Sequence, residues 1–242
     1  MFFLIIVKSR REILWTLIFV ISGLAFGAAV HFTPVFKTFG QRSAKSIEVI
    51  ADAGHGLPDG GTVGSSGTIE QEINLAVTQK LCEVLEGKGI RVTMTRTGEN
   101  CLCEDQEGKT LRQIKKEDMN NRLDIIKKSN ADLFISIHMN YFNSRSVDGL
   151  RLFYSANHPE IKRLAENIQS RMSEVTGAKM YAVKTADKNL FLMKNPPVPA
   201  ILIECGFLSN IEEEKKLNDG DYQSRIAWAI ADAVEKYYKE MF

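Results

Sequence analysis

From Lys45 onward, short apolar segments alternate with longer segments whose apolar residues recur at intervals of three and four. The short segments predict strands at residues 47–51, 91–95, 133–138, 150–154 and 200–204. The longer segments predict helices at 70–85, 159–175 and 221–238, together with one that ends near Lys128. This alternation predicts one α/β domain, in which helices cover both faces of a mostly parallel or mixed sheet.

The N-terminal region has a different character. Lys8, Arg10 and Arg11 precede an uncharged apolar segment at residues 13–30, a pattern typical of an export signal or a signal anchor. The apolar segment is long enough to cross a bilayer, and its basic flank is expected to stay on the cytoplasmic side. A buried core helix is the alternative, but it fits poorly with the basic flank and the polar residues that follow. We therefore expect a signal peptide or signal anchor at 1–31, a linker at 32–45 and an exported folded domain at 46–242.

Charge and cysteine content exclude two classes of protein. The formal net charge is +1, whereas a nucleic-acid-binding surface normally shows a clear excess of Lys and Arg. The four cysteines, Cys82, Cys101, Cys103 and Cys205, are too few for a disulfide scaffold and lack zinc-ribbon spacing. We expect mostly free thiols, with at most one bridge that involves Cys101 or Cys103.

Two of the predicted strands lead to a histidine. The strand at 47–51 is followed by His55, which has a glycine on each side, and the strand at 133–138 ends on His138. A single histidine in such a place is more often structural than catalytic. However, Glu70 begins the helix that follows His55, and the carboxyl ends of strands in an α/β sheet meet at one edge. Two imidazoles and a carboxylate with an open fourth position are the ligand set of a catalytic zinc ion.

A further carboxylate lies at the end of another apolar strand. Glu204 closes the segment at 200–204, and burying an unpaired charge is costly, so this carboxylate needs a partner or a function. The plainer interpretation is a salt bridge to a nearby Lys or Arg. Beside a zinc-activated water, the same group can act as a general base and then as a general acid. Three zinc ligands at neighbouring strand ends favour the second interpretation.

These residues lie within five motifs that follow one another along the chain. The motifs are DAGHGLPDGG at 52–61, EQEINL at 70–75, TMTR at 93–96, ADLFISIHMN at 131–140 and IECGFLSN at 203–210. With them, the chain resembles the zinc-dependent N-acetylmuramoyl-L-alanine amidases, the amidase type 3 family. The resemblance implies a catalytic domain at 46–242 with a six-stranded sheet, one zinc ion held by His55, Glu70 and His138, and Glu204 as the catalytic carboxylate.

The resemblance also implies a substrate and a place of action. Such enzymes use zinc-activated water to hydrolyse the amide between N-acetylmuramic acid and the L-alanine of the peptidoglycan stem peptide. Within the family, the short turn after His55 and the charged insert at 99–118 are most similar to germination-specific spore-cortex amidases. That likeness implies a role in forming muramic-δ-lactam, a location in the cell wall or the spore intermembrane space, a membrane contact through the N-terminal segment, and a lipoprotein or other activating protein as partner.

Several other residues are candidates for supporting roles. Asn74, Asn140 and Asp52 can orient the ligands or the substrate, because ligand imidazoles usually donate their other N–H to an acceptor. Arg122 and Arg151 are alternative binders of acidic stem-peptide groups, unless they are ordinary surface arginines. In the family pattern Glu72 points away from the site, and strand alternation points Cys205 to the face opposite Glu204. The insert at 99–118 is expected to be a solvated surface segment, or else a flap over the site.

Three alternatives stay open at this point. The first is a vegetative cell-wall autolysin of the same family, and the second is an exported zinc peptidase that cleaves bonds within the stem peptide. The third is a non-catalytic wall-binding protein that keeps the fold. The third predicts loss of at least one of His55, Glu70, His138 and Glu204, and all four are present.

Overall fold

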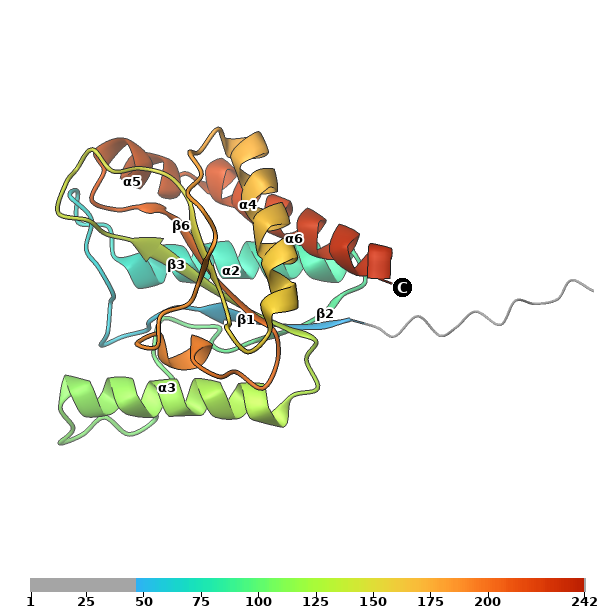
Figure 1. Ribbon diagram of the computed structural model, residues 1–242. Coiled ribbons are helices and arrows are strands. Elements are labelled where there is room, and N and C mark those ends of the chain that lie inside the picture. The colour runs from blue at the N-terminus through green and yellow to red at the C-terminus, as the bar shows by residue number, and fades with distance from the viewer. Residues whose placement is uncertain (1–46, 242) are drawn as a thin grey trace, which may run out of the picture. The chain divides into compact units, whose positions relative to one another are not determined.

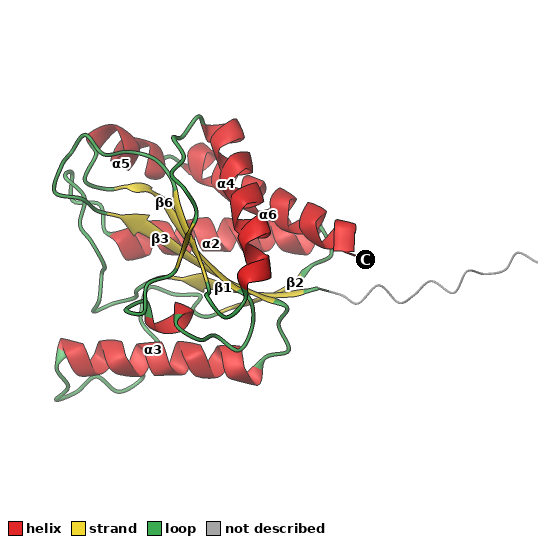
Figure 2. Ribbon diagram, viewed as in Figure 1, coloured by secondary structure: helices red, strands yellow, loops and turns green. Residues whose placement is uncertain are grey.

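The computed structural model describes residues 47–241, in which a six-stranded sheet lies between helices on its two faces (Figures 1 and 2). The α/β architecture and the six strands confirm the predicted fold. The predicted signal segment at 1–31 and linker at 32–45 lie outside the described residues. Among residues 47–241, no helix combines the length and the apolar character that a membrane span requires.

The sheet is mixed, and its strands follow the order β2-β1-β3-β6-β4-β5. All neighbouring strands pair in parallel except β4 and β6, which are antiparallel. Both β3 and β6 lie inside the sheet with helices over both faces, which is why their sequences are almost continuously apolar. The strands are β1 (Glu48–Ala53), β2 (Arg91–Met94), β3 (Leu133–Asn140), β4 (Arg151–Tyr154), β5 (Lys184–Thr185) and β6 (Ala200–Phe207).

The helices divide between the two faces of the sheet. The helices α2, α4 and α6 pack on one face in a large apolar cluster, whereas α3 and a short 3-10 helix, η2, cover the other face. Figure 1 shows α3 apart from the other long helices, across the sheet. The helices are α2 (Glu70–Gly87), α3 (Leu111–Lys128), α4 (Lys162–Thr176), α5 (Ile211–Leu217) and α6 (Gly220–Met241), with 3-10 helices η1 (Pro159–Ile161) and η2 (Phe191–Met193).

The path of the chain places a crevice at the carboxyl ends of β1 and β3. From β1 the chain passes through α2 to β2 on one side, and then through α3 to β3 on the other side of β1. Because α2 and α3 lie on opposite faces, the connections diverge between β1 and β3. Ligand sites of α/β sheets form at such a topological switch point. The two predicted histidines follow or end these two strands.

The charged insert at 99–118 is more ordered than we predicted. Its side chains include a small buried cluster of Cys101, Cys103 and Ile114. Its second half already belongs to α3, because Thr110 caps that helix in a capping box with Gln113. The insert is therefore only partly a solvated surface segment. All four cysteines are buried free thiols, as the prediction of mostly free thiols expects.

Candidate metal centre

His55 follows β1 in a backbone conformation that few side chains adopt. Its φ is 62°, in the left-handed region, where a non-glycine residue is strained. Two buried arginines hold the chain here: Arg122 donates to the carbonyl oxygens of Ala53 and His55, and Arg96 donates to those of Ala53 and Gly54. The strained turn is thus stabilised by four hydrogen bonds to consecutive carbonyls.

The two nitrogens of the His55 ring face different carboxylates. Nδ1 lies 2.9 Å from Oδ2 of Asp59, and Nε2 lies 3.3 Å from Oε1 of Glu70. Burial opposes protonation of the ring, but the two carboxylates outweigh it and raise the pKa of His55 to about 9. Asp59 also forms an ion pair of 2.9 Å with Lys115 of α3. This arrangement directs Nε2 toward Glu70.

Glu70 begins α2 and is almost fully buried. Its Oε2 accepts a hydrogen bond of 2.9 Å from the backbone N–H of Thr62. Its Oε1 accepts from the N–H of Met139 at 3.2 Å and from the side-chain amide of Asn74 at 3.3 Å. Burial raises the pKa of this carboxyl, but the two histidines reverse the effect and hold the pKa well below its usual range. Glu70 is therefore ionised and rigidly placed.

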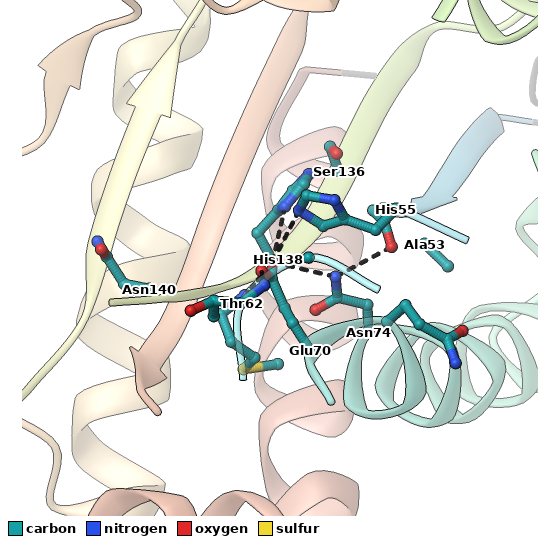
Figure 3. Close-up of polar contacts among 12 residues, drawn as sticks. Ala53, His55, Thr62, Glu70, Asn74, Ser136, His138 and Asn140 are labelled. Carbon is teal, nitrogen blue, oxygen red and sulfur yellow. Dashed lines mark hydrogen bonds and ion pairs between the residues drawn. The ribbon is translucent and has the colours of Figure 1, made fainter. Parts of the chain in front are cut away.

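His138 completes the group from the end of β3. Its Nδ1 lies 3.1 Å from Oε1 of Glu70, and its ring meets that of His55 edge to face at 5.1 Å (Figure 3). The ring lies directly over Gly54, where an added Cβ would come within 2.2 Å of its Cε1 atom. The glycine before His55 is therefore required by the position of His138.

The donor set and its spacing fit a zinc ion. One ligand atom from each of His55, Glu70 and His138 lies within 4.8 Å of the other two. Within residues 47–241 no other group of His, Cys, Asp or Glu is arranged in this way. Two imidazoles and one carboxylate leave a tetrahedral ion one open position, as in catalytic zinc sites.

Glu204 lies beside this group on β6. It is the register partner of His138 in the parallel β3–β6 pair, so the two side chains share one face of the sheet. Its Oε2 is buried and has no hydrogen-bond partner within the described chain. Burial raises the pKa of Glu204 to about 7, which suits a group that accepts and releases a proton. Cys205 points to the opposite face into the apolar core, as predicted.

A cavity of about 650 Å³ opens over these residues. Its floor is formed by β3 and β6, and its walls by α3 and the segment around η2. Tyr141 and Phe191 are large exposed side chains that line it. The insert residue Lys115 also faces this cavity, so the insert contributes to its wall.

The structure corrects two of the predicted supporting roles. Asp52 does not accept a hydrogen bond from an imidazole; it binds Thr95, Ser136 and Arg122 inside the domain. Arg122 cannot bind an acidic substrate group, because it is fully buried in ion pairs with Asp52 and Asp118. These residues brace the turn that carries His55.

The structure places Asn74 and Asn140 at the site and Glu72 away from it, as predicted. Asn74 donates to the carboxylate of Glu70 and to the carbonyl oxygen of Gly54, so it orients the Glu70 side chain. Asn140 lines the cavity and accepts from the N–H of Tyr141. Glu72 is exposed and points away from the site.

Asp59 is a candidate site residue that the sequence analysis did not identify. It lies four residues after His55 in the LPDGG turn, and its carboxylate contacts the imidazole there. The general preference of ligand histidines for a carboxylate partner was the available signal. This preference is met equally well by Asp52 in the sequence. Only the path of the turn shows that Asp59, and not Asp52, reaches the imidazole of His55.

The family model and several relatives found by comparison with known proteins are amidases. Residues 49–236 match the model of the N-acetylmuramoyl-L-alanine amidase family. Over 196 residues the chain is 34% identical to the germination-specific N-acetylmuramoyl-L-alanine amidase of Bacillus subtilis strain 168, which covers 79% of this chain and 80% of that protein.

Two solved structures share the fold. The CwlD amidase from Clostridioides difficile, solved in complex with the GerS lipoprotein, is 39% identical with a TM-score of 0.77, and the match covers 81% of this chain and 100% of that one. The catalytic domain of the amidase CwlV from Bacillus (Paenibacillus) polymyxa is 29% identical with a TM-score of 0.69, and covers 80% and 98% respectively.

Proposed function

The chain belongs to the N-acetylmuramoyl-L-alanine amidase family, and from this premise we propose that it is a zinc enzyme with His55, Glu70 and His138 as ligands and Glu204 as the catalytic carboxylate. Its reaction is hydrolysis of the amide between N-acetylmuramic acid and the L-alanine of the stem peptide. The observation that carries the proposal is the convergence of three ligand atoms within 4.8 Å beside the buried, unpaired Oε2 of Glu204.

Each residue has a part in the reaction that follows from its contacts. A zinc ion in this site supplies Lewis acidity, which polarises the scissile carbonyl and acidifies water. Glu204 accepts a proton from the attacking water and returns it to the leaving alanine nitrogen, for which a pKa of about 7 is well matched. Asp59 and Asn74 keep His55 and Glu70 in place, and the walls of the cavity hold the peptidoglycan strand and its stem peptide.

The biological setting is part of the same proposal. The germination-specific relative supports action in the spore cortex, where the product serves muramic-δ-lactam formation. A complex with a lipoprotein, as the Clostridioides difficile structure is described, supports a similar partner for this chain. Action on peptidoglycan requires a location outside the cytoplasmic membrane, and we infer that the N-terminal segment directs the chain there and can anchor it. A vegetative autolysin differs in one respect: a deletion strain would keep normal muramic-δ-lactam in its spores.

Glu204→Gln provides the direct test. The change keeps the size of the side chain but removes its basicity, so hydrolysis of a purified muropeptide should fall by about 100-fold or more. Zinc content, measured by atomic absorption on the purified full-length protein, should stay at one ion per chain. Glu72→Gln is the matched control, because this exposed glutamate lies on the same helix as Glu70 and should leave activity unchanged.

The product identifies the bond that is cleaved. An amidase releases the intact stem peptide with a free N-terminal L-alanine, whereas a peptidase leaves alanine attached to muramic acid. Mass spectrometry of the digest distinguishes them. Full activity of Glu204→Gln would remove Glu204 from the proposed role, and retained alanine would replace the amidase assignment with the peptidase one.

A further inference from the structure

Arg151 lies next to Glu204 on the neighbouring strand. In the antiparallel β4–β6 pair, Arg151 is the register partner of Glu204, so both side chains leave the same face of the sheet. Cβ atoms of such partners are about 4.5–5.5 Å apart. The same face carries His138 on β3 and forms the floor of the cavity. Arg151 therefore extends the row of site residues by one strand, toward the edge of the sheet.

The guanidinium of Arg151 has no polar partner in the described chain. Its Nε atom is buried without a hydrogen bond, and within residues 47–241 the guanidinium forms no ion pair at 4.0 Å or less. The other two arginines near the site differ: Arg96 and Arg122 each donate several hydrogen bonds. Arg151 interacts with Glu204 through charge alone, so its N–H groups lack a hydrogen-bonded partner and are available to a ligand.

Aromatic rings hold the guanidinium in place. Its Cζ atom lies 4.5 Å from the ring centre of Tyr181 and 5.4 Å from that of Phe207. The backbone N–H of Tyr181 donates to the carbonyl of Leu150, which ties this ring to the start of β4. Cation–π contacts position an arginine without neutralising it, so its N–H groups stay free for an anion. Lys179 also contacts the Tyr181 ring, at 5.1 Å, but it is paired with Asp148 at 3.7 Å, so Arg151 is the cation here that no carboxylate pairs within the described chain.

We propose that Arg151 binds a carboxylate of the stem peptide and thereby positions the scissile amide against Glu204. The inference rests on the proposed amidase function and names the substrate group that the site recognises. A guanidinium offers a planar pair of donors that matches a carboxylate in two parallel hydrogen bonds. With Arg151 and Glu204 side by side, a peptide carboxylate on the arginine places the neighbouring amide within reach of the catalytic carboxylate.

The test combines two substrates with two proteins. The substrates are a muropeptide whose stem peptide has its free carboxylate beside the L-alanine, and the same muropeptide with that group as a carboxamide. The wild-type protein should cleave the carboxylate form with a kcat/KM about 10- to 100-fold higher, mainly through KM. In Arg151→Met, kcat/KM for the carboxylate form should fall to that for the carboxamide form, and kcat/KM for the carboxamide form should stay nearly unchanged. Arg151→Lys should restore part of the preference for the carboxylate form.

Two controls separate substrate recognition from other effects. Arg225→Met removes an exposed arginine that also stacks on a tyrosine, Tyr222, but lies on α6 away from the cavity, so the preference should persist. Binding is measured independently of turnover by titrating both muropeptides into Glu204→Gln and into Glu204→Gln with Arg151→Met. The dissociation constant should rise about 10- to 100-fold for the carboxylate form alone.

The outcomes are distinct. If Arg151→Met weakens cleavage and binding of both substrates equally, Arg151 acts through Glu204 or through folding, and the inference is overturned. If the wild-type protein shows no preference for the carboxylate, the inference is also overturned while the amidase function stands. If the wild-type protein releases no peptide with N-terminal L-alanine from either substrate, the proposed function itself is wrong.

Discussion

At the scale of single residues, the centre depends on which nitrogen of His55 faces the metal position. Nδ1 of His55 contacts the Asp59 carboxylate at 2.9 Å, which leaves Nε2, 3.3 Å from Glu70, as the nitrogen that would bind a metal ion. The carboxylate of Asp59 is itself held by Lys115. Hydrogen bonds from the backbone N–H groups of Thr62 and Met139 likewise fix the orientation of the Glu70 carboxylate. The orientation of the proposed ligands is thus set by neighbours that lie outside the proposed metal position.

The first prediction concerns Asp59→Asn. Loss of the carboxylate weakens the hydrogen bond to His55 and lowers the basicity of its ring, so zinc affinity should fall by about 10- to 100-fold. Competition with a chromophoric chelator measures this affinity directly. The matched control is Lys115→Met, which removes the ion pair to Asp59 but keeps its contact with His55 and should leave affinity nearly unchanged. Equal affinity of Asp59→Asn and the wild-type protein would contradict the orienting role.

At the scale of elements, the success of sequence reasoning depended on burial. The strands β1, β3 and β6 are covered on both faces and have continuous apolar sequences, so their existence and their starts were predicted, but each continues two or three residues beyond its predicted end. In contrast, β5 has two exposed residues at the sheet edge and shows no pattern that distinguishes it from a loop. The short helix α5 is defined by the cap of Asn210 rather than by periodicity, and it was also missed.

The site followed the same rule. His55, Glu70 and His138 could be placed together because they follow, begin or nearly end a regular element, and Glu204 because it lies in the carboxyl half of β6. Asp59 lies within a turn whose path no periodic pattern encodes. The burial of the Arg122 side chain could not be predicted either, because it depends on contacts between residues about 70 positions apart, such as that with Asp52.

The second prediction tests the brace between α3 and β1. Arg122→Met leaves Asp52 and Asp118 buried without their counter-charge, so the free energy of unfolding at pH 7 should fall by about 3–5 kcal/mol. Chemical denaturation measures it. Arg171→Met is the control: this arginine also pairs with two carboxylates, Asp232 and Glu174, but is partly exposed, and should cost at most about 1 kcal/mol. Similar losses in the two variants would contradict the brace.

The same brace predicts a pH dependence. Burial raises the pKa of Asp52, but Arg122 and the hydroxyls of Ser136 and Thr95 outweigh burial and hold it below 3.8. A carboxyl with a lowered folded-state pKa stabilises the fold above its unfolded pKa, and this contribution is lost as pH falls through the folded pKa. Wild-type stability should therefore decrease below about pH 4. In Arg122→Met this decrease should be smaller, because protonation removes the unpaired buried charge of Asp52 and so stabilises the folded state. The same dependence of stability on pH in both proteins would contradict this prediction.

At the scale of the whole molecule, the metal centre joins segments that are far apart along the chain. His55 follows β1, Glu70 begins α2 and His138 lies near the end of β3, so one ion bound here would link the two sides of the switch point. The unfolded chain holds no such arrangement of ligands. The proposed zinc ion would therefore bind the folded domain in preference to the unfolded one, and its binding energy would add to stability by mass action.

The last prediction follows from this linkage. At free zinc about 100-fold above the dissociation constant, binding stabilises the fold by about 2.7 kcal/mol. Each kcal/mol shifts Tm by about 2–4 °C for a domain of this size, so chelation with EDTA should lower Tm by roughly 5–10 °C. Calorimetry at several zinc concentrations measures the shift. His138→Ala should show one Tm at all concentrations, because two of the three ligands bind zinc weakly. A wild-type Tm that does not change with zinc concentration would mean that the group of His55, Glu70 and His138 holds no metal.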